Sequence, residues 1–132
     1  MTPLNSKLVV VESPCSGKDA AEFQKHFLYL LWACRDLVEI GRDPIASHLV
    51  GPWFLDDTIP AERDRGIQSE WFWRGEHHYF FLDLGLSSGM KHALERCERQ
   101  KIKIIETKLR KISFDHYLNG VFPSHTPGFA IG

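Results

Sequence analysis

The sequence predicts an α/β fold built around a parallel sheet of four to five strands. First, short runs rich in β-branched and aromatic residues alternate with longer segments in which apolar residues recur every three or four positions. Second, the first run is apolar throughout, as expected of a strand buried on both faces. Third, a helix between successive strands gives the right-handed crossover that parallel neighbours require. Ligands of such sheets bind outside the carboxyl ends of the strands.

The first strand and the first helix have the clearest pattern. LVVVE (residues 8–12) is the buried strand. From about Asp19 a single apolar helical face follows. Its residues are Phe23, Phe27, Leu30, Leu31, Cys34 and Val38. Asp19 or Ser16 is placed to cap the start of this helix, and Gly41 follows its end, where a left-handed residue is common.

The second strand is predicted at PIASHLV (residues 44–50), with Pro44 at its entry, where no ladder hydrogen bond is lost. The connection over residues 51–66 is long and rich in proline, glycine and charge, and loops of this kind are often functional. A helix is expected from about Pro60 to Arg74.

The second half of the chain repeats the alternation. HYFFLDLG (residues 78–85) is the third predicted strand, residues 87–100 the next helix, and IKIIETKL (residues 102–109) the fourth strand. The α/β domain is expected to span residues 1–110. Residues 111–132 form a C-terminal extension, for which the sequence leaves open an edge strand, an arm to a neighbouring subunit, or a tail.

The overall charge argues against nucleic acid and membrane partners. The 132 residues suit one domain, and 16 Lys and Arg against 17 Asp and Glu give a net charge of −1. The locally basic segment 91–111 is typical of a solvated helix face and strand end. No apolar run approaches the ~20 residues of a membrane span, and the amino terminus lacks a signal-peptide core, so a cytoplasmic location is expected.

The cysteines and histidines do not suggest a metal site or a cofactor. Three cysteines stand far apart without a CxxC pair, which argues against zinc and disulfides. His77 and His78 are adjacent in a strand and point to opposite faces. His48, near the end of the second predicted strand, is in a ligand-facing position, although a lone histidine is more often structural. No cofactor and no metal are predicted.

The loop after the first strand resembles a phosphate-binding loop without matching one. A Walker A motif requires Gly where Glu12 stands and Ser or Thr where Asp19 stands, so an ATPase of that type is excluded. Ser13, Ser16 and Gly17 can still present hydroxyls and amides to a phosphate or ribose at a helix amino terminus. An ordinary strand-to-helix turn is the alternative.

The long connection holds further candidates. Asp57 belongs to an acidic cluster that can supply a general acid or base, although a hydrated loop surface explains it equally well. Trp53 and Phe54 beside it can stack on a base or plug the end of the sheet. No serine-hydrolase elbow and no Cys–His arrangement occurs.

Taken in order, the motifs resemble a known family. ESPCSGKD, GRDPIASHLVGPWFLDD, PAERDRGI, an apolar strand and SSGM follow one another as in the nucleoside 2-deoxyribosyltransferase-like domains, especially their small phage and bacterial members, over residues 8–105. The resemblance implies a flavodoxin-like three-layer sandwich that binds a nucleoside or nucleotide. It implies homo-oligomers, and, in active members, cleavage of an N-glycosidic bond by a helix glutamate assisted by an aspartate.

This sequence departs from the family at the nucleophile. The pattern Ser-x-Gly-Met-x-x-Glu begins here at Ser87, and its glutamate position is occupied by Ala93. Asp83 fits the assisting acid, and Asp83 or Asp57 is the candidate general base if catalysis survives. The resemblance then implies ligand contacts from these residues: Ser13, Ser16, Gly17, His48, Trp53, Phe54, Ser88, Gly89 and Met90.

Three functions follow as hypotheses. The favoured one is a nucleotide-binding protein with lost or altered chemistry, which, if a phage encodes it, would sequester a host signalling nucleotide. The second is an N-glycosidase or deoxyribosyltransferase that uses rearranged carboxylates. The third is a protein-interaction module whose pocket is vestigial.

Overall fold

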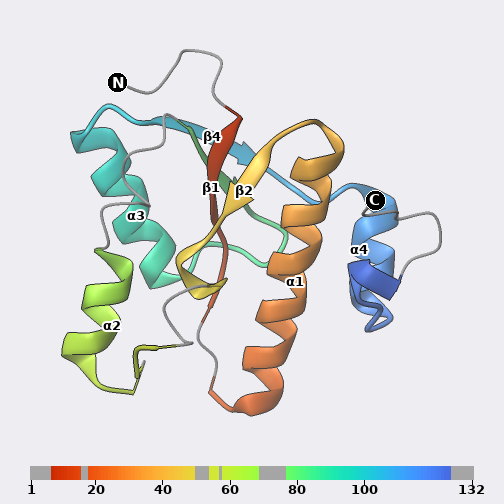
Figure 1. The fold of residues 1–132 in the computed structure, drawn as a ribbon, viewed down its shortest axis with the longest axis horizontal. Coiled ribbons are helices and arrows are strands. Elements are labelled where there is room, and N and C mark those ends of the chain that lie inside the picture. The colour runs from red at the N-terminus through yellow and green to blue at the C-terminus, as the bar shows by residue number, and fades with distance from the viewer. Residues whose placement is uncertain (1–6, 16–17, 50–53, 57, 69–76, 126–132) are drawn as a thin grey trace.

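The computed structural model shows one parallel sheet with helices on both faces. The residues that it describes are 7–15, 18–49, 54–56, 58–68 and 77–125. The strands are β1 (Leu8–Glu12), β2 (Asp43–Ile45), β3 (His77–Phe81) and β4 (Lys103–Thr107). Within the described residues they form one sheet in the order β2-β1-β3-β4, with every pair parallel (Figure 1). This order matches the first four strands of the flavodoxin-like sheet and confirms the predicted fold class.

The helices complete the three layers. They are α1 (Ala20–Glu39), α2 (Pro60–Ile67), α3 (Ser88–Arg99) and α4 (Lys111–Leu118), with short 3-10 turns η1 (Ser47–Leu49) and η4 (Pro123–His125). Figure 1 shows α1 and α4 on one side of the sheet and α2 and α3 on the other. No helix among the described residues is long and apolar enough to cross a membrane.

Strand alternation divides the core between these two sides. Val9 and Val11 of β1 lie in one apolar cluster with Tyr79 and Phe81 of β3, beneath α1. Phe80 lies in a second cluster with residues of α3, because successive side chains of a strand point to opposite faces. The register that pairs Val11 with Tyr79 keeps residues of equal parity on the same face of both strands.

The predicted limits of α1 are confirmed by its caps. Asp19 Oδ1 accepts a hydrogen bond from the Glu22 amide at 2.9 Å, so Asp19 is the N-cap. Gly41 follows the helix with a φ of +85°, a conformation in which a side chain would be strained. The predicted apolar face is partly wrong, since Val38 is 46% exposed, whereas Tyr29 and Trp32, which the pattern omitted, are buried.

Other predicted boundaries shift where backbone pairing ends. The second strand is β2 and stops at Ile45; the Leu49 amide then bonds the Ala46 carbonyl at 3.1 Å in η1. The third and fourth strands, β3 and β4, begin within one residue of the predicted starts and end earlier than predicted. Helix α2 starts at Pro60 as predicted and ends at Ile67, while the rest of its predicted span, from residue 69 to Arg74, lies outside the described residues.

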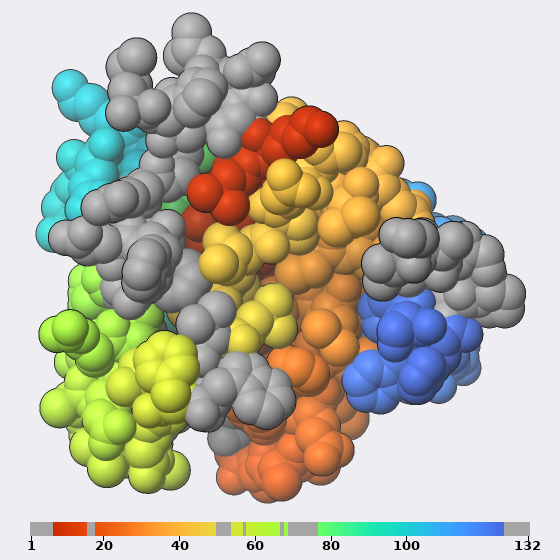
Figure 2. Space-filling model, in the orientation of Figure 1, coloured from red at the N-terminus to blue at the C-terminus, as the bar shows by residue number. Residues whose placement is uncertain are grey.

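The described part of the C-terminal extension is helical. Helix α4 packs against α1, and the Trp32 indole donates to the Val121 carbonyl at 2.7 Å. Figure 2 shows this segment, in blue, lying against the side of α1, in orange. Residues 111–125 therefore add a helix to the α1 face rather than a strand to the sheet.

Candidate functional site

The strand order reverses between β1 and β3, which marks the expected ligand crevice. From β1 the chain moves to β2 on one side, and then crosses to β3 on the other side of β1. Loops that leave the carboxyl ends of β1 and β3 therefore diverge, and the space outside those ends is where ligands of open α/β sheets bind. Ser13 directly follows β1, and Asp83 follows β3 by two residues.

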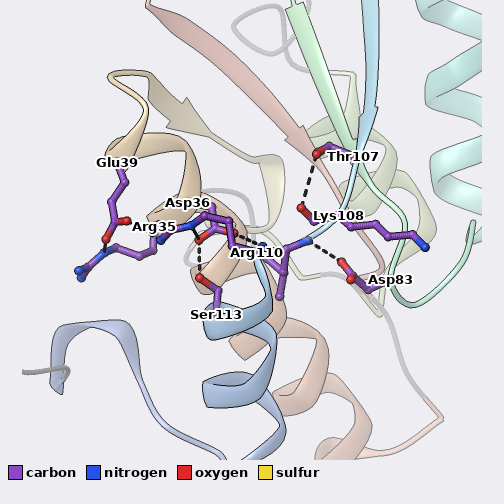
Figure 3. Close-up of polar contacts among 9 residues, drawn as sticks. Arg35, Asp36, Glu39, Asp83, Thr107, Lys108, Arg110 and Ser113 are labelled. Carbon is purple, nitrogen blue, oxygen red and sulfur yellow. Dashed lines mark hydrogen bonds and ion pairs between the residues drawn. The ribbon is translucent and has the colours of Figure 1, made fainter.

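Asp83 is held by groups from α1 and from the connection that follows β4. Its Oδ2 accepts a hydrogen bond from the Tyr29 hydroxyl at 2.5 Å and from the Leu109 amide at 2.9 Å. The Asp83 amide in turn donates to the Tyr29 hydroxyl oxygen at 3.1 Å. Both acceptor bonds use one oxygen, and no described residue donates to Oδ1. The carboxylate is thus fixed in orientation, and its Oδ1 accepts from no described residue. Figure 3 shows Asp83 hydrogen-bonded to the segment between Lys108 and Arg110.

Tyr29 remains a donor throughout the ordinary pH range. Burial raises the pKa of the Tyr29 hydroxyl strongly, and the hydrogen bond and negative charge of Asp83 raise it further. The phenol therefore stays protonated, and its single proton is committed to Asp83 Oδ2. This hydrogen bond joins the middle of α1 to the end of β3.

Ser13 has a buried hydroxyl that pairs with no other residue in the described part of the chain. The residue is 3% exposed, and its Oγ finds no hydrogen bond among the described residues. Continuing the alternation of Val9 and Val11 past the end of β1 would put Ser13 on the α1 side of the sheet, the side on which Asp83 bonds to Tyr29. A buried hydroxyl left unsatisfied costs about 1–3 kcal/mol, so this position favours a hydrogen-bonding ligand.

His48 lies on η1, after the carboxyl end of β2. Burial lowers the pKa of His48 to about 4, and the charges of Arg63 and His26 act in the same direction. Arg63 comes from α2 and His26 from the amino-terminal half of α1. His48 is neutral at pH 7, and the charge of Arg63 would favour an anionic group near it.

Of the three ligand contacts predicted at the start of α3, two residues are exposed and one is buried in the core. Ser88 and Gly89 are exposed at the beginning of α3, while the preceding Ser87 caps the helix by accepting from the Met90 amide at 3.2 Å. The Met90 side chain, 2% exposed, packs against Phe80 in the core. Its backbone and side chain are therefore both engaged within the protein.

Ala93, at the position of the family nucleophile, also belongs to this core. It is 7% exposed and packs with Phe80 and Cys97. Glu95, two positions on, is exposed on the opposite side of the helix. Helix α3 therefore presents no carboxylate on the face where position 93 lies.

The remaining predicted residues fall into two groups. Phe54 is described and is 70% exposed. Four others lie outside the described residues: Ser16, Gly17, Trp53 and Asp57. In the described part of the chain, no cluster of histidine, cysteine or acidic residues has the arrangement of a metal site.

Sequence reasoning missed the groups that support Asp83. Tyr29 is 54 positions from Asp83 in sequence, and the Leu109 amide is 26 positions away. A backbone amide carries no sequence signature. Helical periodicity places Tyr29 beside Leu30 of the predicted apolar face of α1, but it gives no signal for a partner on another element.

Most of the chain matches a known protein family. Residues 7–107 match the family model of DUF7768, described as a domain of unknown function. The chain belongs to the DUF7768 family. The DUF7768 match contains the whole sheet and α1 to α3, and it ends before Leu109 and α4. No curated protein and no solved structure matched the chain.

Proposed function

We propose that this DUF7768 domain binds a nucleoside or nucleotide in the crevice outside β1 and β3. The observation that carries the proposal is the fixed carboxylate of Asp83, whose Oδ1 is available on the same side of the sheet as the unsatisfied Ser13 hydroxyl. A carboxylate at a strand end is a suitable acceptor for sugar hydroxyls, as in dinucleotide-binding sheets. A serine hydroxyl both donates and accepts, which suits a sugar or phosphate oxygen.

The charges near His48 indicate how such a ligand would be oriented. The base and sugar would lie nearer Asp83, and a phosphate would lie toward His26, His48 and Arg63. The amino terminus of α1 is at the same edge of the sheet, and its helix dipole favours an anion. The resemblance to nucleoside 2-deoxyribosyltransferase-like domains supports the same class of ligand.

Binding without cleavage is the favoured form of this proposal. Cleavage of an N-glycosidic bond with retention needs two carboxyl groups, one of them a nucleophile at the anomeric carbon. Among the described strand ends, Asp83 faces the α1 side, whereas Glu12 lies 3.8 Å from the Nδ1 atom of His78 on the opposite side. Ala93 supplies no nucleophile. Sequestration of a nucleotide, including a signalling nucleotide, is the role that this arrangement suits.

The test is a binding panel of common ribonucleosides, deoxyribonucleosides and their 5′-monophosphates at millimolar concentration. A panel member that binds the native state raises the melting temperature, with a stabilisation of about 2.7 kcal/mol at roughly 100 times its Kd. Recovery of that compound intact, checked by mass spectrometry, supports binding alone. Absence of any shift would overturn the proposal and favour the interaction-module hypothesis.

Asp83→Asn tests the named residue. The amide oxygen of asparagine can still accept from Tyr29 and Leu109, but an NH2 group replaces Oδ1, so folding is retained and an acceptor is lost. We expect affinity to fall about 10- to 100-fold. Glu106→Gln, an exposed acid-to-amide change on β4, is the matched control and should bind like the unmodified protein. Release of free base that disappears in Asp83→Asn would instead establish the glycosidase alternative.

A further inference from the structure

In the segment between β4 and α4, two consecutive backbone amides each donate a hydrogen bond to a different aspartate. The Leu109 amide donates to Asp83 Oδ2 at 2.9 Å, and the Arg110 amide donates to Asp36 Oδ2 at 2.8 Å. Figure 3 shows Asp83 and Asp36 on the two sides of this short segment. The carboxylate of the proposed site thus takes part in anchoring the chain that leads into α4.

Asp36 of α1 supplies the cap that α4 lacks. Arg110 is the N-cap of α4 and makes no capping hydrogen bond with its own side chain. The buried Asp36 carboxylate instead accepts from the Arg110 amide, the Arg110 guanidinium and the Ser113 hydroxyl. A negative charge at this position also suits the dipole of α4. Helix α4 is therefore seated on α1 at a defined place.

Helix α4 also contacts the residue that orients Asp83. The ring of Tyr117 meets the ring of Tyr29 edge-on, with centroids 5.4 Å apart. The neighbouring residue of α4, His116, stacks on Trp32 of α1, with ring centroids 5.1 Å apart. The Tyr29 side chain is thus held between α4 on one side and Asp83 on the other. Two routes connect α4 to the carboxylate, one through the Leu109 amide and one through the Tyr29 ring.

We propose that Tyr29 and the Leu109 amide are positioning groups for Asp83, so that ligand binding and the docking of α4 stabilise each other. This inference rests on the proposed function. Leu109 and α4 lie beyond the residues that match the DUF7768 family model, so the extension of this chain supports a site in its family domain. Coupling between two such events is reciprocal, because whatever tightens one must tighten the other by the same factor.

The first test compares two tyrosine-to-phenylalanine variants in the full chain. The probe is the panel member that gives the largest melting-temperature shift with the unmodified protein. Tyr29→Phe removes the hydroxyl that donates to Asp83, and we expect its affinity for the probe to fall about tenfold. Tyr117→Phe keeps the ring contact with Tyr29 and should leave the affinity unchanged.

The second test measures hydrogen exchange in the unmodified protein. Saturation with the probe should slow exchange of the Leu109 and Arg110 amides, and the slowing should be smaller in Tyr29→Phe. A role of Tyr29 in folding alone would not make the protection of these amides depend on the ligand. Ser113→Ala, remote from the crevice, should also weaken probe binding and gives a second variant if Tyr29→Phe does not fold.

The outcomes separate the two proposals. If the unmodified protein binds a probe, but Tyr29→Phe and Ser113→Ala bind it equally well and the Leu109 amide is not protected, the positioning inference is wrong and the proposed function stands. If no panel member binds the unmodified protein, the proposed function fails, and the inference that rests on it fails too.

Discussion

The two faces of the sheet are built on different principles. Beneath α3 the core cluster of Phe80, Met90 and Cys97 is apolar, and burial together with the charge of Glu12 raises the pKa of the Cys97 thiol to about 12. The buried His78 of β3 lies on the same side of the sheet, with its Nδ1 atom 3.8 Å from Glu12 Oε1. Beneath α1 and α4 the core includes buried polar groups, among them Asp36 and the Tyr29 hydroxyl. Burying polar groups is costly unless they are paired, so the hydrogen bonds of Asp36 and of the Tyr29 hydroxyl hold this face in a specific arrangement.

This difference bears on the proposed binding site. Helix α3 carries the position at which the resemblance places a nucleophile, yet that position contributes only packing. The α1 face carries an oriented carboxylate and a buried hydroxyl that no described group satisfies. The site is therefore expected on the α1 face, and changes on the two faces should have different consequences.

The largest expected effect comes from placing the family nucleophile in this chain. Ala93→Glu puts a carboxylate where the residue is 7% exposed, against Phe80 and Cys97. Burial of an unpaired charge and overpacking should lower the free energy of unfolding by at least about 3 kcal/mol, measured by urea denaturation. Glycosidase activity should not appear.

The matched control is His92→Glu, which adds a carboxylate at an exposed position next to it on α3. Its stability should change by less than about 0.5 kcal/mol. A stable Ala93→Glu protein that cleaves nucleosides would show that position 93 faces a pocket, and the contrast between the two faces would then be wrong.

A smaller loss of stability is expected on the α1 face. Asp36→Ala removes the acceptor of three hydrogen bonds, from the Arg110 amide, its guanidinium and the Ser113 hydroxyl. Since Arg110 is partly exposed and can turn to water, we expect a loss of about 2–3 kcal/mol in the free energy of unfolding, with faster hydrogen exchange through α4.

Asp115→Ala is the control for this change, because its ion pair with Lys111 is exposed at the surface of α4. Such pairs contribute about 0–1 kcal/mol. Equal losses from Asp36→Ala and Asp115→Ala would show that α4 is held by surface contacts instead of by the buried carboxylate.

The fold was predictable because its evidence is local. The apolar run of β1 and the Asp19 cap depend on neighbouring residues, and both are confirmed. The second strand was extended too far, since Leu49 lies in the 3-10 turn η1 and packs against the core instead of pairing with β1. An apolar run alone does not distinguish these two ways of burying side chains.

The contacts that orient Asp83 in the candidate site could not be predicted, because they join residues that are far apart in the sequence. The topology rule leads from the sequence to the strand ends at Ser13 and Asp83, whose role remains a proposal. Tyr29, by contrast, was missed because its hydroxyl group makes tyrosine a weak member of an apolar helical pattern. Such a pattern also gives no information on a hydrogen-bond partner beyond the end of β3. Contacts between residues far apart in sequence follow from tertiary packing, which no local pattern encodes.

The smallest effect expected is a dependence of the free energy of unfolding on pH, caused by His48. Burial, with the charges of Arg63 and His26, lowers the pKa of His48 from 6.5 to about 4 in the folded chain. Between these values the unfolded chain binds a proton that the native state excludes, so stability is full above pH 6.5 and is lost as the pH falls toward 4. The loss should be on the order of 2 kcal/mol, because His48 keeps some exposure to water.

His48→Gln should remove this part of the pH dependence, while His92→Gln, at an exposed site, should retain it. The measurement is the free energy of unfolding from pH 7 to 4, together with an NMR titration of the His48 ring. An ordinary titration near pH 6.5 would contradict the burial of His48. Inorganic phosphate should raise the His48 pKa if an anion binds beside it, since a negative charge favours the protonated ring. A phosphate-independent titration would place the anionic end of the ligand elsewhere, even if Asp83 binds the sugar.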